Sequence, residues 1–268
     1  MKISAFIICW PGKEKNAQYI AKCIFKYVDQ LVTIYSTKDN SLVSGAGKWV
    51  KVSDEWYYGK KFKKNLELNK CDSMIHIHAD AYSDNWIKLV KNFKQSINLF
   101  PNLGIWMPKE KIKLFDSSNI FHRRFKNTKK INFNSILDII PKVEINNKAI
   151  ETNRFIFSCQ TDTTIWAITK KVISRLKKIN YNFNNLGWGI DSFALAYSYS
   201  NNLLVIRDNS STFKHDFFKK RISNYSHANA LIQMNYFFKQ LTIQEKIILK
   251  LANDFFVSTL KKNSEKKN

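Results

Sequence analysis

The chain has 268 residues, of which 44% are hydrophobic and 14% aromatic, and this supply of apolar side chains argues against wholesale disorder. Its 44 basic and 21 acidic side chains give a formal net charge of +23, which favours anionic partners such as nucleic acid, phosphorylated substrates or a negatively charged membrane face. Four cysteines without C-x-x-C spacing give no support to a zinc ribbon or a disulfide framework, and no apolar run reaches the ~18 residues that would span a bilayer.

The first half of the chain alternates between apolar runs and amphipathic stretches. Strands are expected at residues 3–9, 31–35, 49–52, 73–78 and 104–107, the last stopped by Pro108. Helices are expected at 13–28 and 60–70, and from a cap at Asp84 to about residue 99. This alternation predicts an α/β fold with a mostly parallel sheet flanked by helices.

The pattern weakens over residues 109–152, which we interpret as an insertion with a helix at 134–140. Strands at 154–158, 164–168 and 203–206 and helices at 170–178 and 191–200 then follow. From residue 217 the chain is expected to be helical, with apolar residues of 243–260 along one face. We therefore expect a main α/β domain over 1–216 and a helical extension over 217–268.

Polar side chains follow the strand expected at 73–78. His76 and His78 alternate with apolar residues, and Asp80 comes two residues later. Ligands of open α/β sheets bind beyond the carboxyl ends of the strands, where a carboxylate can hold a metal ion bound to phosphate oxygens. The alternative for each histidine is that it faces a partly polar side of the sheet, but Asp80 needs a partner in either case.

Two glycines flank a tryptophan at Gly187, Trp188 and Gly189, shortly before Asp191. Glycines let the backbone bend closely around a large flat ring. One interpretation is an aromatic platform for a sugar, beside a carboxylate that accepts a proton from a hydroxyl. The alternative is an N-cap aspartate next to a packed tryptophan.

Two further segments could contribute to a site. His215 follows the last expected strand and could complete a metal site begun by Asp80, although alone it is more typical of a loop histidine. Gly59 opens a lysine-rich helix whose N-terminus would attract phosphate. A solvated cationic face is the alternative for its lysines other than Lys64.

The order of these segments resembles that of inverting, nucleotide-sugar-dependent glycosyltransferases of the GT-A fold. The first strand and turn at 6–12 are similar to the family's nucleotide-binding segment, and residues 35–41 resemble its polar turn with the leading acids lost. Lys64-Asn65 stands where the family has Arg-Asn, and His78-Ala79-Asp80 where it has Asp-x-Asp. The resemblance covers roughly residues 2–216.

The resemblance implies a GT-A-like (Rossmann-like) fold and a role for each matched residue. Contacts to the nucleotide sugar would come from Cys9, Trp10, Pro11, Tyr35, Ser36, Lys64, His78, Ala79 and Asp80. Asp80 and His215 would hold Mn²⁺ or Mg²⁺, and Gly187, Trp188 and Gly189 would contact the sugar or acceptor. Asp191 would be the base that deprotonates the acceptor hydroxyl, so that single displacement inverts the anomeric configuration.

The expected partners are a nucleotide-sugar donor and a glycan or lipid-linked acceptor, in the synthesis of surface polysaccharide or lipopolysaccharide. We expect no nucleic acid, because arginine is scarce and an RRM-like aromatic signature is missing. The expected location is the cytoplasm, where free thiols persist. The stretch 243–260 could lie on an anionic inner membrane face, or simply pack on the core.

Several alternatives stay open. A retaining transferase of the same fold would use Asp191 to position the acceptor without taking its proton, and the product anomer separates the two. A basic nucleic-acid-binding protein without catalysis would show tight, salt-dependent RNA binding. A nucleotidyltransferase is disfavoured, because no glycine-rich basic loop follows the first strand. The lysine excess itself has a second explanation, an AT-rich genome.

Overall fold

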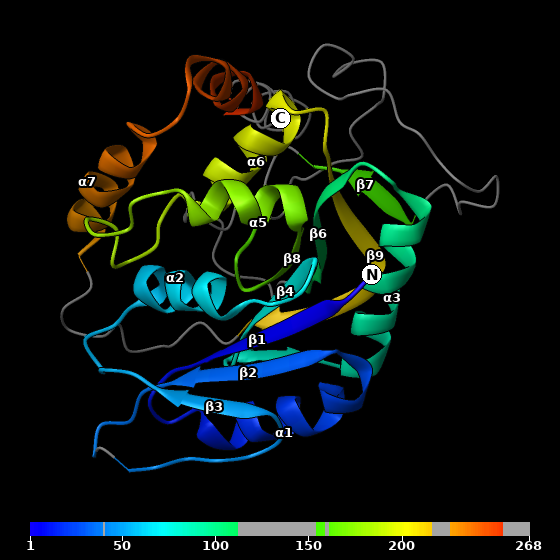
Figure 1. Ribbon diagram of the computed structural model, residues 1–268, viewed down its shortest axis with the longest axis vertical. Helices are drawn as coiled ribbons and strands as arrows, with labels where there is room; N and C mark the ends of the chain where they lie inside the picture. Colours follow the sequence, from blue (N-terminus) through cyan, green and yellow to red (C-terminus); the bar gives the residue numbers. More distant parts are fainter. Residues whose placement is uncertain (40, 112–153, 159–160, 216–225, 254–268) are drawn as a thin grey trace, which may run out of the picture.

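The computed structural model describes residues 1–39, 41–111, 154–158, 161–215 and 226–253 (Figure 1). The helix expected at 134–140 and nearly all of the expected insertion lie outside these residues, as do 216–225 and 254–268. The division of the chain at residue 216 therefore stays a prediction.

The described strands form one mixed sheet. They are β1 (Ile3–Cys9), β2 (Gln30–Tyr35), β3 (Lys48–Lys51), β4 (Ser73–His78), β5 (Ala81–Ser83), β6 (Leu103–Glu110), β7 (Phe155–Phe157), β8 (Ile165–Thr169) and β9 (Leu204–His215). Their order is β3-β2-β1-β4-β8-β6-β9-β5, with β7 paired to β9. Strands β1, β2, β3, β4, β6 and β9 run in one direction and β5, β7 and β8 run against them.

Helices cover both faces of this sheet (Figure 1). They are α1 (Glu14–Ile24) with the short 3-10 helix Phe25–Tyr27, α2 (Tyr58–Leu68), α3 (Trp86–Leu99), α5 (Lys170–Lys177), α6 (Ile190–Ser200) and α7 (His227–Phe238). Residues 243–253 are also helical. In β1, Phe6 and Ile8 pack into the core under α2, α5 and α6, whereas Ala5 and Ile7 pack into the core under α1 and α3. A strand buried on both faces is rich in apolar residues, and this is why β1 was predictable, whereas β4 was predictable from apolar residues that alternate with His76 and His78.

The expected mixed α/β architecture with a mostly parallel sheet is confirmed, with local corrections. Strand β6 does not stop at Pro108 but continues to Glu110, and its register with β9 shifts directly after the proline. A bulge accommodates a residue that cannot donate to the ladder. The cap of α3 is Asn85, whose side chain accepts from the Lys88 amide, whereas Asp84 forms an ion pair with Lys111.

Strand β9 is the largest correction, because it has 12 residues where only 203–206 were expected. Its second half is polar in sequence, so no apolar run marks it, yet this half pairs with β6 and with the unpredicted three-residue strand β5. The first half pairs with β6 and β7. His215 is therefore the last residue of a strand and not a loop histidine.

Candidate active site

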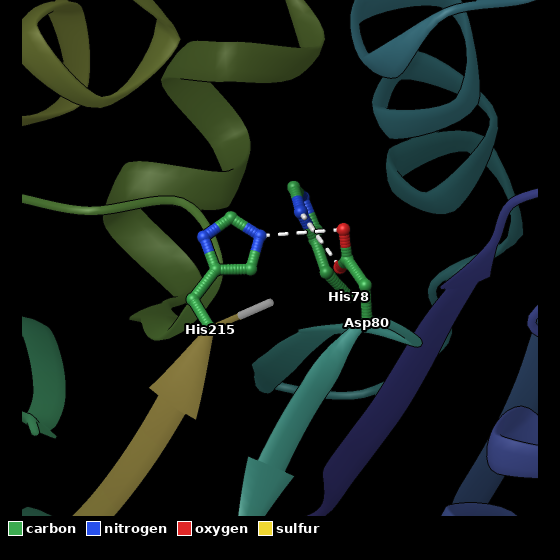
Figure 2. Close-up of side chains that lie close together, drawn as sticks. All are labelled: His78, Asp80 and His215. Atoms are coloured by element: carbon green, nitrogen blue, oxygen red, sulfur yellow. Dashed lines mark ion pairs between the residues drawn. The ribbon is translucent and has the colours of Figure 1, made fainter. Parts of the chain in front are cut away.

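Three polar side chains meet where β4 and β9 end. His78 is the last residue of β4, Asp80 follows it, and His215 is the last residue of β9. His215 Nε2 lies 3.3 Å from Asp80 Oδ2, and His78 Nδ1 lies 3.9 Å from Asp80 Oδ1. Figure 2 shows both imidazole rings beside the Asp80 carboxylate. One ligand atom from each residue lies within 4.8 Å of the other two, a spacing that suits a single metal ion.

The turn that carries Asp80 is held by two neighbouring elements. The amide of Ala79 donates to the carbonyl of Ile8 in β1 at 2.8 Å, and the Asn16 side chain of α1 donates to the carbonyl of Ala81 at 3.1 Å. Ala81 begins β5 and pairs with His215. Backbone pairing thus fixes the position of both residues, and this allows the site to be formed before any ligand binds.

Burial and charge set the protonation of these three groups. Burial alone would raise the pKa of Asp80, but the hydrogen bond and charge of His215 lower it below its ordinary value. Burial opposes protonation of His215, yet the hydrogen bond to Asp80 and the charge of Asp80 raise the pKa of His215. Burial lowers the pKa of His78 to about 4, so this imidazole is neutral near pH 7 and keeps a lone pair for a metal.

Two atoms of the cluster are buried without a hydrogen-bond partner among the described residues, namely Asp80 Oδ1 and His78 Nε2. Asp80 is only 5% exposed and His78 only 9%, so water does not readily satisfy them. A divalent ion would satisfy the carboxylate and use the neutral imidazole. The residues therefore fit such an ion, and two imidazoles with one carboxylate suit Mn²⁺ better than Mg²⁺, which prefers oxygen ligands.

A buried lysine links the ends of β1 and β2. Lys61 is fully buried, and its ammonium donates to the Cys9 carbonyl at 3.1 Å and to Ser36 Oγ at 2.9 Å. The same ammonium lies 4.4 Å from the centre of the Trp10 ring, which meets the His78 ring edge-on at 5.8 Å. A positive charge thus lies beside the metal-ligand cluster, at the sheet edge where anionic ligands of such folds bind.

The sequence interpretation missed Lys61 and named Lys64 instead. Lys64 forms an ion pair with Glu67 on the surface of α2, and the structure places no contact between it and the cluster among the described residues. Helical periodicity carried the missing signal, because Lys61 shares the buried face of α2 with Phe62 and Asn65. A lysine on the apolar face of a helix needs an internal partner.

Replacing Lys61 by methionine is expected to change how stability depends on pH. Burial lowers the pKa of Lys61 from 10.5 to about 8, so between these values the unfolded chain holds a proton that the folded chain has lost. Folding is therefore favoured increasingly as pH rises through this window, by up to about 1.4 kcal/mol per pH unit. In urea unfolding at pH 7 to 10, the wild type should gain stability relative to Lys61→Met. Lys64→Met is the matched control on the same helix. If the wild type gained as much stability relative to Lys64→Met as relative to Lys61→Met, the interpretation would be contradicted.

The start of α2 does not offer the phosphate site that was expected. The amide of Gly59 donates to the Asn185 carbonyl at 2.8 Å, and the amide of Tyr57 donates to Asn185 Oδ1 at 3.1 Å. A Cβ on Gly59 would lie 1.8 Å from the Asn184 carbonyl oxygen. The glycine is needed for the close approach of residues 184–185, which occupy the helix N-terminus.

The Gly-Trp-Gly segment reaches the cluster through Tyr58. The Tyr58 ring lies 5.0 Å from the His78 ring, and a Cβ on Gly187 would lie 2.2 Å from the Tyr58 ring. Burial, and to a smaller degree the charge of Asp191, raises the pKa of Tyr58 well above its usual value. Asp191, in the first turn of α6, is therefore on the same side of the sheet as His78.

The glycines on either side of Trp188 have the backbone conformation that such a turn requires. Gly187 and Gly189 both have positive φ angles, 79° and 81°, which glycine adopts without strain. Gly189 is the N-cap of α6, so Asp191 is not the cap. The half-buried Trp188 ring meets His227 of α7 edge-on at 5.4 Å.

Three of the remaining predicted contact residues, Cys9, Tyr35 and Ala79, pack in the core under α1 and α3. The Tyr35 ring packs in the core under α1 and α3, and its hydroxyl accepts from the Val43 amide at 3.2 Å. Cys9 packs in the same core, where burial raises the pKa of its thiol to about 12. Pro11 follows Trp10 in the turn after β1, and Ala79 is fully buried between His78 and Asp80.

Two carboxylates near the cluster were not singled out from sequence. Burial and the charge of Asp162 raise the pKa of Glu110, at the end of β6, to about 7. The charges of both carboxylates also act on His215. Glu110 follows the proline that was expected to end its strand, so the sequence interpretation placed it in the insertion.

No family model and no curated protein matches the chain. Solved structures do match it. The structure of GalNAc-T7 with UDP, GalNAc and Mn²⁺ aligns with a TM-score of 0.57 and 9% identity, over 92% of this chain and 49% of that chain. S. aureus TarS, residues 1–349, aligns with a TM-score of 0.51 and 10% identity, over 97% and 81%. A mycobacterial protein aligns with a TM-score of 0.50 and 11% identity, over 87% and 71%.

Similarity at such low identity shows the fold and not the activity. The mixed α/β architecture of this chain matches these structures, and the expected GT-A-like fold class is confirmed. This chain spans about half the length of the GalNAc-T7 structure.

Proposed function

We propose that this protein is a glycosyltransferase that moves a sugar from a nucleotide-diphosphate sugar to a hydroxyl of a glycan or lipid-linked acceptor. The observation that carries the proposal is the His78–Asp80–His215 cluster, buried at the carboxyl ends of the strands with two unsatisfied ligand atoms. The shared fold adds support, because the GalNAc-T7 structure of that fold contains UDP, GalNAc and Mn²⁺. We place the activity in surface-glycan synthesis in the cytoplasm.

The residues that surround the cluster have complementary tasks in this proposal. His78, Asp80 and His215 would hold a divalent ion, which when bound neutralises the charge developing on the leaving diphosphate. The Lys61 ammonium and the Trp10 ring would form the nucleotide side of the site. Their contacts within the chain, to Ser36, the Cys9 carbonyl and each other, orient them in advance.

The acceptor side is assigned to the segment that packs on Tyr58. Trp188 would offer its ring to the acceptor sugar, since aromatic faces stack on apolar faces of sugar rings. Asp191 would accept the proton of the attacking hydroxyl, so that the oxygen reaches the anomeric carbon opposite the leaving diphosphate. A single displacement of this kind inverts the anomeric configuration.

The test is a donor screen by calorimetry with UDP-, GDP- and CMP-sugars, with and without Mn²⁺. We expect one nucleotide class to bind, and to bind only with metal. Failure of every donor under every metal condition would reject the proposal. Binding of random RNA that is tight at moderate salt would instead favour the nucleic-acid alternative.

Metal selectivity is a separate expected result. Because the cluster offers two imidazole nitrogens and one carboxylate, Mn²⁺ should bind at least about tenfold more tightly than Mg²⁺, which prefers an oxygen-rich shell. Competition calorimetry at pH 7.5 measures both affinities on the same sample. Equal affinities, or tighter Mg²⁺ binding, would show that the two histidines are not ligands.

A further inference from the structure

The last two helices expose a concentration of apolar side chains. Twelve large hydrophobic residues in the described part of the chain are exposed, and half of them lie between residues 231 and 251. They are Leu231, Ile232 and Tyr236 of α7, and Ile243, Ile247 and Leu251 of the helix 243–253. Single exposed apolar residues are normal on a protein surface, whereas a concentration on two consecutive helices indicates an interaction surface.

The helix 243–253 is anchored by its inner face. Glu245 is buried and accepts two hydrogen bonds from Arg175 of α5, each 2.9 Å long. Ile248 and Ala252 pack in the core with residues of α2, α5 and α6. This corrects the expectation that Ile247, Ile248 and Leu251 would share one face, because Ile248 is buried and the other two are exposed.

The outer face of this helix carries a second apolar stripe. At ~100° per residue, Ile243 and Ile247 project roughly opposite Glu245, and Leu251 lies one turn beyond Ile247. Ile243 is 79% exposed and Ile247 48%. We call Ile243, Ile247 and Leu251 the outer stripe. A helix that only packs on a core needs one apolar face, so the outer stripe requires a different explanation.

Among residues 227–253, lysines border the outer stripe. Lys246 and Lys250 are exposed on the same helix, and Lys239 lies over the Tyr236 ring of α7 at 5.1 Å. Glu245 is the sole acidic residue of the sequence 227–253 and is buried in its ion pair with Arg175, whereas Asp254, the next residue along the chain, lies outside the described residues. Exposed apolar residues bordered by lysines are typical of helices that lie in the interface of an anionic bilayer.

We propose that the outer stripe, the exposed side of α7 and these three lysines dock on an anionic lipid bilayer, with the helices lying in the membrane surface. No helix of the described chain is long and apolar enough to cross a bilayer. A second copy of the chain is a poorer occupant, since residues 227–253 offer no exposed acid of their own to face the same lysines across a two-fold contact. The net charge of +23 adds long-range attraction to an anionic surface.

Vesicle flotation tests the docking directly. We expect the full chain to float with vesicles of phosphatidylcholine and phosphatidylglycerol, and not with phosphatidylcholine alone. Binding should weaken several-fold when salt is raised from about 0.1 to 0.5 M, and about fivefold for each of Lys246→Gln and Lys250→Gln. The double change Ile243→Ser and Ile247→Ser should lower the partition coefficient more than tenfold, because it removes buried apolar area.

The matched control is Leu42→Ser, which removes an 85% exposed leucine far along the chain and should leave vesicle binding unchanged. Unchanged melting temperatures show that the outer-stripe variant is folded. Equal binding to neutral vesicles, or full binding by the outer-stripe variant, overturns the proposal. The proposal is also overturned if the wild type does not bind vesicles but sediments as a dimer, and the outer-stripe variant sediments as a monomer. Donor binding is measured in a separate experiment, so the vesicle result tests membrane docking whether or not the protein is a glycosyltransferase.

Discussion

Asp80→Asn is expected to abolish metal-dependent donor binding while leaving the fold intact. Asp80 supplies the sole negative charge among the three clustered ligands, and one of its oxygens is buried without a hydrogen-bond partner among the described residues. Asparagine keeps the shape and one carbonyl oxygen but removes the charge. Loss of an outer-shell partner already costs ~10–100-fold in metal affinity, so loss of this ligand should cost more. Calorimetry with Mn²⁺ alone, and then with donor, measures the two effects separately.

The matched control for this change is Asp84→Asn. Asp84 lies four residues further along the chain, is 66% exposed in its side chain and forms an ion pair with Lys111 on the surface. We expect Asp84→Asn to bind Mn²⁺ and donor within about twofold of the wild type, since surface ion pairs contribute little. Asp80→Asn that binds Mn²⁺ like the wild type would show that the cluster is not the metal site.

Asp80→Asn should also change how the stability of the metal-free protein depends on pH. The raised pKa of His215 depends on its hydrogen bond to Asp80 and on the charge of that carboxylate. A histidine with a raised pKa adds stability below its unfolded pKa, and this stability is lost as pH rises through the folded value. In Asp80→Asn the stability gained on acidification through the histidine range should therefore be smaller than in the wild type.

The strands of the sheet were predictable where an apolar run in the sequence has the same bounds as the strand. Strands β1 and β4 are buried on both faces, so residues 3–9 and 73–78 form unbroken apolar or alternating runs whose bounds the structure reproduces. Strand β9 was not predictable over its full length. Its polar half is specified by pairing with β6 and β5, and tertiary partners of this kind leave no mark on local sequence.

The part of the candidate site that lies directly after the ends of strands was predictable from the sequence. Asp80 and His215 were expected to share a metal, and the structure brings their side chains within 3.3 Å. His78 was assigned to the nucleotide, and this assignment stays a prediction; the structure also groups its imidazole with Asp80 and His215 in the candidate metal cluster. Lys61 was missed because the sequence interpretation did not separate it, by helical periodicity, from the other lysines of α2. The role of each residue stays a prediction until the variants are measured.

Asp191→Asn is expected to lower turnover by about 10²–10⁴-fold, the usual contribution of a general base, with little change in donor affinity. The reason is position: Asp191 lies in the first turn of α6, its charge acts on Tyr58, and it does not belong to the His78–Asp80–His215 cluster proposed to hold the metal. Donor affinity by calorimetry and turnover with a saturating acceptor distinguish the two effects.

Glu110→Gln tests a rival proton acceptor. The pKa of Glu110 is raised to about 7, so this carboxyl can accept or release a proton near neutral pH. If Glu110→Gln loses turnover and Asp191→Asn does not, the base is Glu110 and the acceptor enters from the β6 side. If Asp191→Asn loses turnover, the anomeric configuration of the wild-type product decides its task. An inverted product requires a base that takes the hydroxyl proton, and Asp191 then has that role. A retained configuration would mean that Asp191 only positions the acceptor, and the transferase would belong to the retaining type.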